Sequence, residues 1–163
     1  MDKPTGTRET YSFEIPLEFE NVPLSSNISG KVEIMKIEEG FNAKITEVKT
    51  TLELVCHKCL KKISQDVNVD MAERQFLMER PAEVRDENDL YLVHKKDLTI
   101  DLGEFLRQEI ILHFPLIPVC SKSCKGLCSV CGKDRNKKNC HCREEKIEEE
   151  KPLAILKQLL KNK

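Results

Sequence analysis

The stretch at residues 120–142 reads CSKSCKGLCSVCGKDRNKKNCHC and holds six of the eight cysteines of this 163-residue chain. The other two stand in CHKC at residues 56–59. The thiols therefore form four closely spaced pairs, which are Cys56-x2-Cys59, Cys120-x3-Cys124, Cys128-x2-Cys131 and Cys140-x-Cys142. Short-spaced pairs on tight turns give zinc two thiolates at a time, and four thiolates complete its tetrahedron. The pattern predicts that all eight cysteines bind metal, as one or two zinc ions.

The sequence allows more than one division of these pairs between sites. In the division that we favour, the pairs at 128/131 and 140/142 form a self-contained finger, and the pair at 56/59 joins the pair at 120/124. The alternative places Cys120, Cys124, Cys128 and Cys131 on one metal. The CxC pair at 140/142 would then share a metal with the distant CxxC pair at 56/59. One occupied site with free thiols elsewhere is a third possibility, and His57 or His141 can replace a thiol.

Two glycines mark the turns of this stretch. Gly132 directly follows Cys131, and Gly126 stands two residues beyond Cys124. Glycine favours such positions because it adopts left-handed or open backbone without steric cost. We therefore expect tight turns that aim backbone amides at the sulfurs.

Catalytic uses of the cysteines are less favoured. A thioredoxin-like role for CHKC needs a helix that starts at the first cysteine, whereas strand-like segments flank this pair. A catalytic zinc keeps an open coordination position, whereas a four-thiolate site is closed, and the chain has no HExxH motif. The sequence predicts structural zinc in a protein that is not an enzyme and has no small-molecule substrate.

Composition and the chain start indicate a compartment. The chain is 39% hydrophobic and 34% charged, as is typical of globular proteins. The start MDKPTGTRET has no apolar signal-peptide region, and no apolar run reaches the ~18 residues of a membrane span. Eight cysteines in a reducing compartment favour metal ligation over disulfides. We expect a cytoplasmic protein without a membrane partner.

The first half of the chain alternates between apolar and polar residues. The alternation predicts a strand that Pro16 places at the edge of a sheet. Its apolar face comprises Tyr11, Phe13, Ile15, Leu17 and Phe19. Further strands are expected at 30–37, 41–46 and 48–55, with a hairpin turn at 38–40. Val67, Val69 and Met71 alternate again beyond CHKC, which makes residues 56–65 a turn between strands.

Two helices are expected in the second half. The first spans 101–113, ends before Pro115, and begins with a capping box between Asp101 and Glu104. Its apolar face comprises Leu102, Phe105, Leu106 and Ile110. The second is a C-terminal helix with a stripe of Leu153, Leu156 and Leu160. Residues 78–90 are expected to be an acidic loop.

These elements predict an α+β fold. It consists of an antiparallel β-sheet or partly open barrel with one long helix, a zinc-bound cysteine-rich finger and a C-terminal helix. We divide the chain into a β-rich body at 1–119 and a cysteine-rich segment with the C-terminal helix at 120–163, which together form one compact unit.

Charge is unevenly distributed. Residues 120–163 carry twelve basic and six acidic side chains, whereas residues 1–119 have a balance of −7. Two four-thiolate zinc sites add −4 and leave the C-terminal part at about +2. Residues 133–139, KDRNKKN, form the basic tip of the predicted finger. The tip holds the candidate contacts for RNA phosphates, which are Lys133, Arg135, Lys137 and Lys138, although a solvated surface explains the same residues. No aromatic residue lies in the finger, which disfavours base stacking.

Three segments carry a resemblance to a known family. They are IDLGEFLRQEIILHFPLIPVC, CKGLCSVCGKDRNKKNCHC and the closing KPLAILKQLL. With the CxxC-L that follows a strand, they resemble the YceD family of large ribosomal RNA subunit accumulation proteins over roughly residues 45–163. The closing segment departs from the family, which often has D-P-R where this chain has Glu150-Lys151-Pro152.

The resemblance implies a role in the synthesis, processing or stability of 23S rRNA and in large-subunit assembly, and it implies no catalytic residue. The partner is then ribosomal RNA or a pre-ribosomal particle. The alternative is an adaptor or chaperone for a basic large-subunit ribosomal protein, and a thiol redox protein is the least favoured hypothesis.

Overall fold

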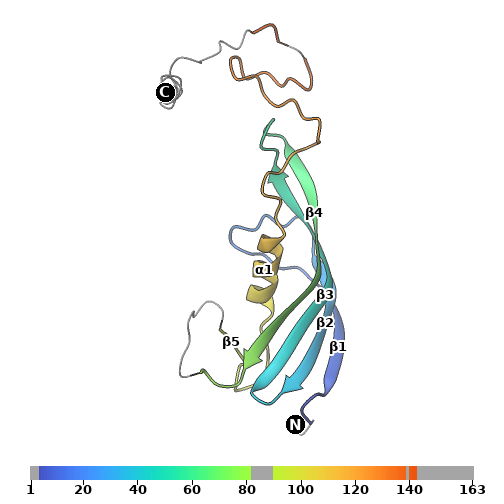
Figure 1. The fold of residues 1–163 in the computed structure, drawn as a ribbon, viewed down its shortest axis with the longest axis vertical. Coiled ribbons are helices and arrows are strands. Elements are labelled where there is room, and N and C mark those ends of the chain that lie inside the picture. The colour runs from blue at the N-terminus through green and yellow to red at the C-terminus, as the bar shows by residue number, and fades with distance from the viewer. Residues whose placement is uncertain (1–3, 82–89, 139, 143–163) are drawn as a thin grey trace, which may run out of the picture.

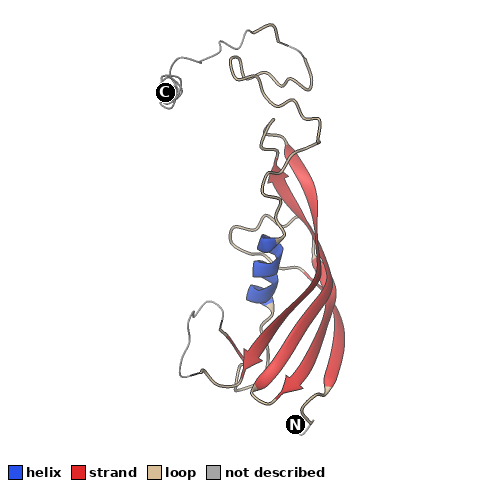
Figure 2. Ribbon diagram, in the orientation of Figure 1, coloured by secondary structure: helices blue, strands red, loops and turns tan. Residues whose placement is uncertain are grey.

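The structure is a computed structural model that describes residues 4–81, 90–138 and 140–142. Its elements are β1 (Arg8–Ile15), β2 (Ile28–Ile37), β3 (Gly40–Val55), β4 (Lys62–Leu77), β5 (Tyr91–Leu92) and α1 (Gly103–Leu112). The strands form one curved sheet in chain order, and α1 lies against its concave side (Figure 1). The cysteine-rich segment extends past the β3–β4 turn as loops without a described helix or strand (Figure 2).

The sheet is mixed. Strands β1 to β4 are antiparallel neighbours, as expected, and the β2–β3 hairpin turns at Glu38 and Glu39. The short β5 pairs in parallel with the end of β4, through Phe76 with Tyr91 and Leu77 with Leu92. The alternation pattern did not predict this strand, because two residues carry no period.

Strand β3 is continuous, whereas the sequence predicted separate strands at 41–46 and 48–55. Where the sequence predicted a break between two strands, the structure has a β-bulge. Glu47 is in the left-handed region at φ 53, and the register with β2 shifts by one residue. Gly30 of β2 lies at this shift, and a Cβ there would stand 3.0 Å from Val48 Cγ2. The bulge bends the ladder without ending it.

The bulge also changes which residues of β4 face the core. Val67 and Val69 are buried as expected, but Met71 is 57% exposed, so its predicted place on the same face is wrong. Val69 pairs with Val48 on one side of the bulge, and Met71 pairs with Thr46 on the other. The alternation therefore changes phase between these pairs.

The core lies between the sheet and α1. Phe105, Leu106 and Ile110 of α1 are buried as predicted. Beside them, Arg74 Nη2 of β4 lies 2.9 Å from Glu109 Oε1, and Glu109 is 6% exposed. This ion pair satisfies a buried carboxylate and joins the helix to β4.

The predicted capping box is wrong. Asp101 Oδ1 accepts a hydrogen bond from Gly103 N at 2.7 Å, and Leu102 occupies the N-cap position without a side-chain cap. Glu104 instead pairs with Arg107 at 2.7 Å, one turn further along the helix. The helix consequently starts two residues later than the sequence predicted.

Two expectations fall outside the described residues, namely the C-terminal helix and most of the acidic loop. Within the described part of the chain, no helix has the length and apolar character to cross a membrane.

Candidate metal centres

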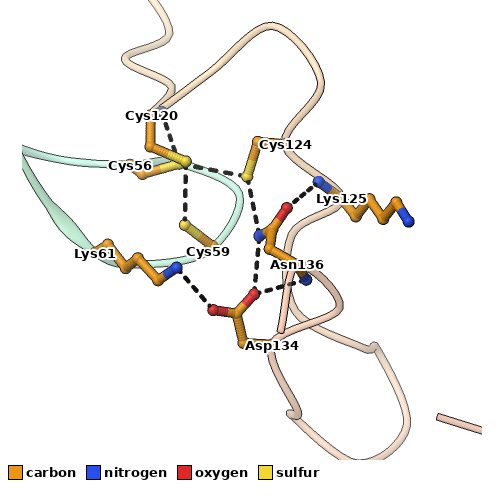
Figure 3. A network of polar contacts seen from close by, with 8 residues as sticks. All are labelled: Cys56, Cys59, Lys61, Cys120, Cys124, Lys125, Asp134 and Asn136. Carbon is orange, nitrogen blue, oxygen red and sulfur yellow. Dashed lines mark hydrogen bonds and ion pairs between the residues drawn. The ribbon is translucent and has the colours of Figure 1, made fainter. Parts of the chain in front are cut away.

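The inner cluster consists of Cys56, Cys59, Cys120 and Cys124, whose sulfur atoms all lie within 4.8 Å of one another. The first two stand on the β3–β4 turn, and the other two on the segment that follows α1 (Figure 3). The Sγ–Sγ distances are 3.9 Å for Cys56–Cys124 and 3.6 Å for Cys59–Cys120. Sulfurs around a tetrahedral zinc at ~2.3 Å lie about 3.8 Å apart. The inner cluster therefore has the dimensions of a four-thiolate site.

Backbone contacts hold the two segments of the inner cluster together. His57 N donates to Pro118 O at 2.8 Å, and Cys120 N donates to Cys56 Sγ at 3.3 Å. Cys56, Cys59 and Cys124 are buried, whereas Cys120 is exposed. The inner cluster thus fastens the chain beyond α1 to the tip of the sheet.

The outer cluster consists of Cys128, Cys131, Cys140 and Cys142, whose sulfurs also lie within 4.8 Å of one another. Cys128 is buried, Cys140 is intermediate, and the other two are exposed. These are the two sets that the favoured division groups, and the alternative set from residues 120–131 is not brought together. Metal binding by either cluster stays a prediction.

The CxxC turns of the two clusters, at 56–61 and 128–133, share the same backbone hydrogen bonds. In each, the N–H of the first cysteine donates to the carbonyl five residues on at 2.8 Å, and the residue four positions on donates back at 2.9 Å. That residue is left-handed in both turns, as Leu60 with φ 59 and Gly132 with φ 68. The turn expected around glycine thus also occurs with leucine.

The thiols of each cluster differ in acidity. Burial acts to raise the pKa of Cys56, but backbone N–H groups that donate to its sulfur outweigh burial and lower the pKa to about 6. Backbone N–H groups likewise lower the pKa of Cys128 to about 6. Hydrogen bonds with neighbouring cysteine side chains raise the pKa of Cys120 and Cys142 to about 12. A divalent cation would relieve the repulsion that opposes ionisation of all four thiols.

Gly126 lies between Cys124 of the inner cluster and Cys128 of the outer cluster, and it approaches the CHKC turn closely. Its φ is +72, and a Cβ there would stand 2.9 Å from Lys58 O. The next residue, Leu127, donates its N–H to that carbonyl at 3.0 Å. The sequence predicted the open backbone of Gly126, but it did not predict this contact with the CHKC turn.

The predicted basic tip divides into two sets of side chains. Lys133, Arg135, Lys137 and Lys138 are exposed. Asp134 instead pairs with Lys61 Nζ at 3.0 Å, which with hydrogen bonds from Asn136 lowers the pKa of Asp134 to about 2. Sequence reasoning missed Asp134 and Asn136, and their one signal was that they are not basic within a basic run.

Comparison with known proteins places this chain in context. A family model described as large ribosomal RNA subunit accumulation protein YceD matches residues 46–160. A curated relative from Arabidopsis thaliana, the chloroplastic large ribosomal RNA subunit accumulation protein YCED homolog 1, is 35% identical over 65 residues. Those residues are 39% of this chain and 20% of the relative, so the chain spans about a fifth of that protein. No solved structure matches the chain.

Proposed function

Because the chain belongs to the YceD family of large ribosomal RNA subunit accumulation proteins, we propose that it is a non-enzymatic factor of large-subunit biogenesis. It supports the synthesis, processing or stability of 23S rRNA, and it acts in the cytoplasm, where its thiols stay reduced. The family match over residues 46–160 is the observation that carries this proposal.

Zinc is the proposed cofactor, as two ions held by the inner and outer clusters. Sulfur separations of 3.6 and 3.9 Å in the inner cluster support this assignment, since both are close to a zinc tetrahedron. Four thiolates leave no coordination position for substrate, so the ions stabilise structure. We place the boundary between the β-rich body and the cysteine-rich segment at Cys120, and the inner cluster makes them one unit.

The proposed RNA contacts are the four exposed basic residues of the tip, Lys133, Arg135, Lys137 and Lys138. Each phosphate contact releases counterions, so the affinity for single-stranded RNA falls with salt by a slope of about 0.7 per contact. Reversal of all four charges should weaken binding to 23S rRNA fragments and reduce the slope by about 3.

The control reverses four basic residues on the body, Lys44, Lys49, Lys95 and Lys96. It makes the same change in net charge away from the tip. Equal loss of binding in both variants, or unchanged binding in the tip variant, contradicts the contact model.

A second candidate function is an adaptor or chaperone for a basic large-subunit ribosomal protein. The balance of −7 on residues 1–119 favours it. Purification of the tagged protein with and without nuclease separates the two functions. Loss of large-subunit proteins after nuclease supports RNA binding, and their retention supports the adaptor.

A further inference from the structure

The segment Asp134–Asn136 belongs to one cluster by sequence and contacts the other in space. It lies between Cys131 and Cys140, so ligands of the outer cluster stand on both sides of it. Its polar side chains nevertheless reach the inner cluster and the turn that carries it (Figure 3). If the outer cluster orders this loop, it therefore also orders the side chains that contact the inner cluster.

Asn136 uses both ends of its amide at the inner cluster. Its Nδ2 donates to Cys124 Sγ at 3.5 Å, and its Oδ1 accepts from Lys125 N at 2.8 Å. These two bonds fix the amide toward the sulfur. Donors around a metal-binding thiolate orient it and stabilise its charge, as outer ligands do in many metal sites.

Asp134 holds Asn136 in place and anchors the loop. Its Oδ1 accepts from Asn136 N at 2.9 Å and from Asn136 Nδ2 at 2.8 Å. Its Oδ2 lies 3.0 Å from Nζ of Lys61, two residues beyond Cys59. The backbone adds Arg135 N to Gly126 O at 2.9 Å.

The loop is closed by the outer cluster. A metal on Cys131 and Cys140 would join its ends and remove much of the conformational freedom of the residues between them. Asp134 and Asn136 then lose less conformational entropy when they contact the inner cluster, because the metal already restricts the loop. Without that closure, the same contacts must order a free loop.

We propose that Asp134 and Asn136 couple the two metal sites, so that metal in the outer cluster raises the affinity of the inner cluster. Asn136 is the positioning residue of this coupling, since it holds Cys124. The inference rests on the proposed zinc binding. Linkage requires that metal in the inner cluster raises the affinity of the outer cluster by the same factor.

The test measures, at peptide resolution, the free zinc concentration at which Cys59 becomes protected from alkylation in the reduced full chain. Four proteins form a cycle: wild type, Cys140→Ser/Cys142→Ser, Asp134→Ala/Asn136→Ala, and all four substitutions together. Removal of the outer cluster should raise the half-protecting concentration at least about fivefold in the wild-type background. The shift should disappear in the Asp134→Ala/Asn136→Ala background.

An unchanged half-protecting concentration after removal of the outer cluster overturns the coupling, as does an equal shift in both backgrounds. Absence of Cys59 protection at any zinc concentration overturns the metal assignment itself, which is a distinguishable result. Far-ultraviolet circular dichroism of each variant identifies any loss of the sheet.

A spectroscopic arm separates the role of Asn136 from simple folding. In the cobalt-loaded protein, Asn136→Ala should move the sulfur-to-cobalt charge-transfer band to longer wavelength, because Cys124 loses an N–H donor. The control is Lys125→Ala, which keeps the backbone N–H and removes an exposed side chain. An unmoved band in Asn136→Ala, or an equal shift in the control, contradicts the positioning role.

Discussion

The inner and outer clusters use the same cysteine turn in opposite surroundings. The inner turn joins two long strands and meets the chain leaving α1, so three of the four thiols of the inner cluster are buried. The outer turn lies among loops, and Cys128 is its one buried thiol. One backbone motif thus serves as a fastening to the sheet in the first case and as a local loop closure in the second. What each cluster contributes to stability follows from what it connects.

The largest expected difference concerns loss of one ligand from each cluster. Cys59→Ser removes the fastening between the sheet and residues 118–124, and should lower the melting temperature of the zinc-loaded protein by about 10 °C or more. Cys131→Ser should lower it by less than about 3 °C, since it frees loops and weakens the inner cluster without removing any of its ligands. Calorimetry with zinc analysis measures both, and equal effects would remove the distinction between the clusters.

A smaller difference is expected for two left-handed glycines. Gly132 has no atom within 4 Å of an added Cβ, so Gly132→Ala should cost about 1 kcal/mol from backbone strain. Gly126→Ala adds the overlap with Lys58 O and should cost about 3 kcal/mol in total. Urea unfolding of the zinc-loaded variants checks this order. If the two costs agree, the close approach of Gly126 to Lys58 O leaves room for a side chain.

The order of thiol modification gives a third comparison. On exposure to an alkylating agent, Cys131 should react first, because it is exposed, and Cys56 and Cys59 should react last, because burial keeps the reagent from their sulfurs. Peptide mass spectrometry over time follows each residue. Early modification of Cys56 would show that the inner cluster opens more readily than its burial indicates.

The smallest effect tests the equivalence of the two turns. Leu60 takes the left-handed position that glycine fills in the outer turn, and it is 64% exposed. Leu60→Gly should stabilise the protein by up to about 1 kcal/mol, because relief of strain exceeds the added chain entropy. Chemical denaturation measures the change, and a clear loss of stability would mean that Leu60 packs in a way its exposure does not indicate.

Parts of the fold followed from local sequence and parts did not. Alternation predicted the strands around Phe13, Val32 and Leu52, because one face of the sheet is buried, but the first strand ends at Ile15, before the predicted Pro16, and Tyr11 is exposed. It failed at Met71, where the change of phase comes from a bulge at Glu47 on the neighbouring strand. Such a change depends on pairing between strands, which one strand's period does not contain.

The candidate sites divide in the same way. The spacing of the cysteines predicted two sets of four, because ligand geometry is local in each pair. Asp134 and Asn136 stand between the basic residues of the tip, and they contact Lys61 and Cys124, which lie elsewhere in the sequence. Such contacts between distant segments are set by the folded chain, and the spacing of the cysteines does not contain them.

The most direct test of the account counts zinc ions per chain by native mass spectrometry in two double variants. Cys56→Ser/Cys124→Ser should keep one zinc, since both residues belong to the inner cluster. Cys56→Ser/Cys140→Ser should keep none, because it removes one ligand from each cluster. The reverse result, or a wild-type chain that holds no zinc, would contradict the division of the cysteines into an inner and an outer metal site.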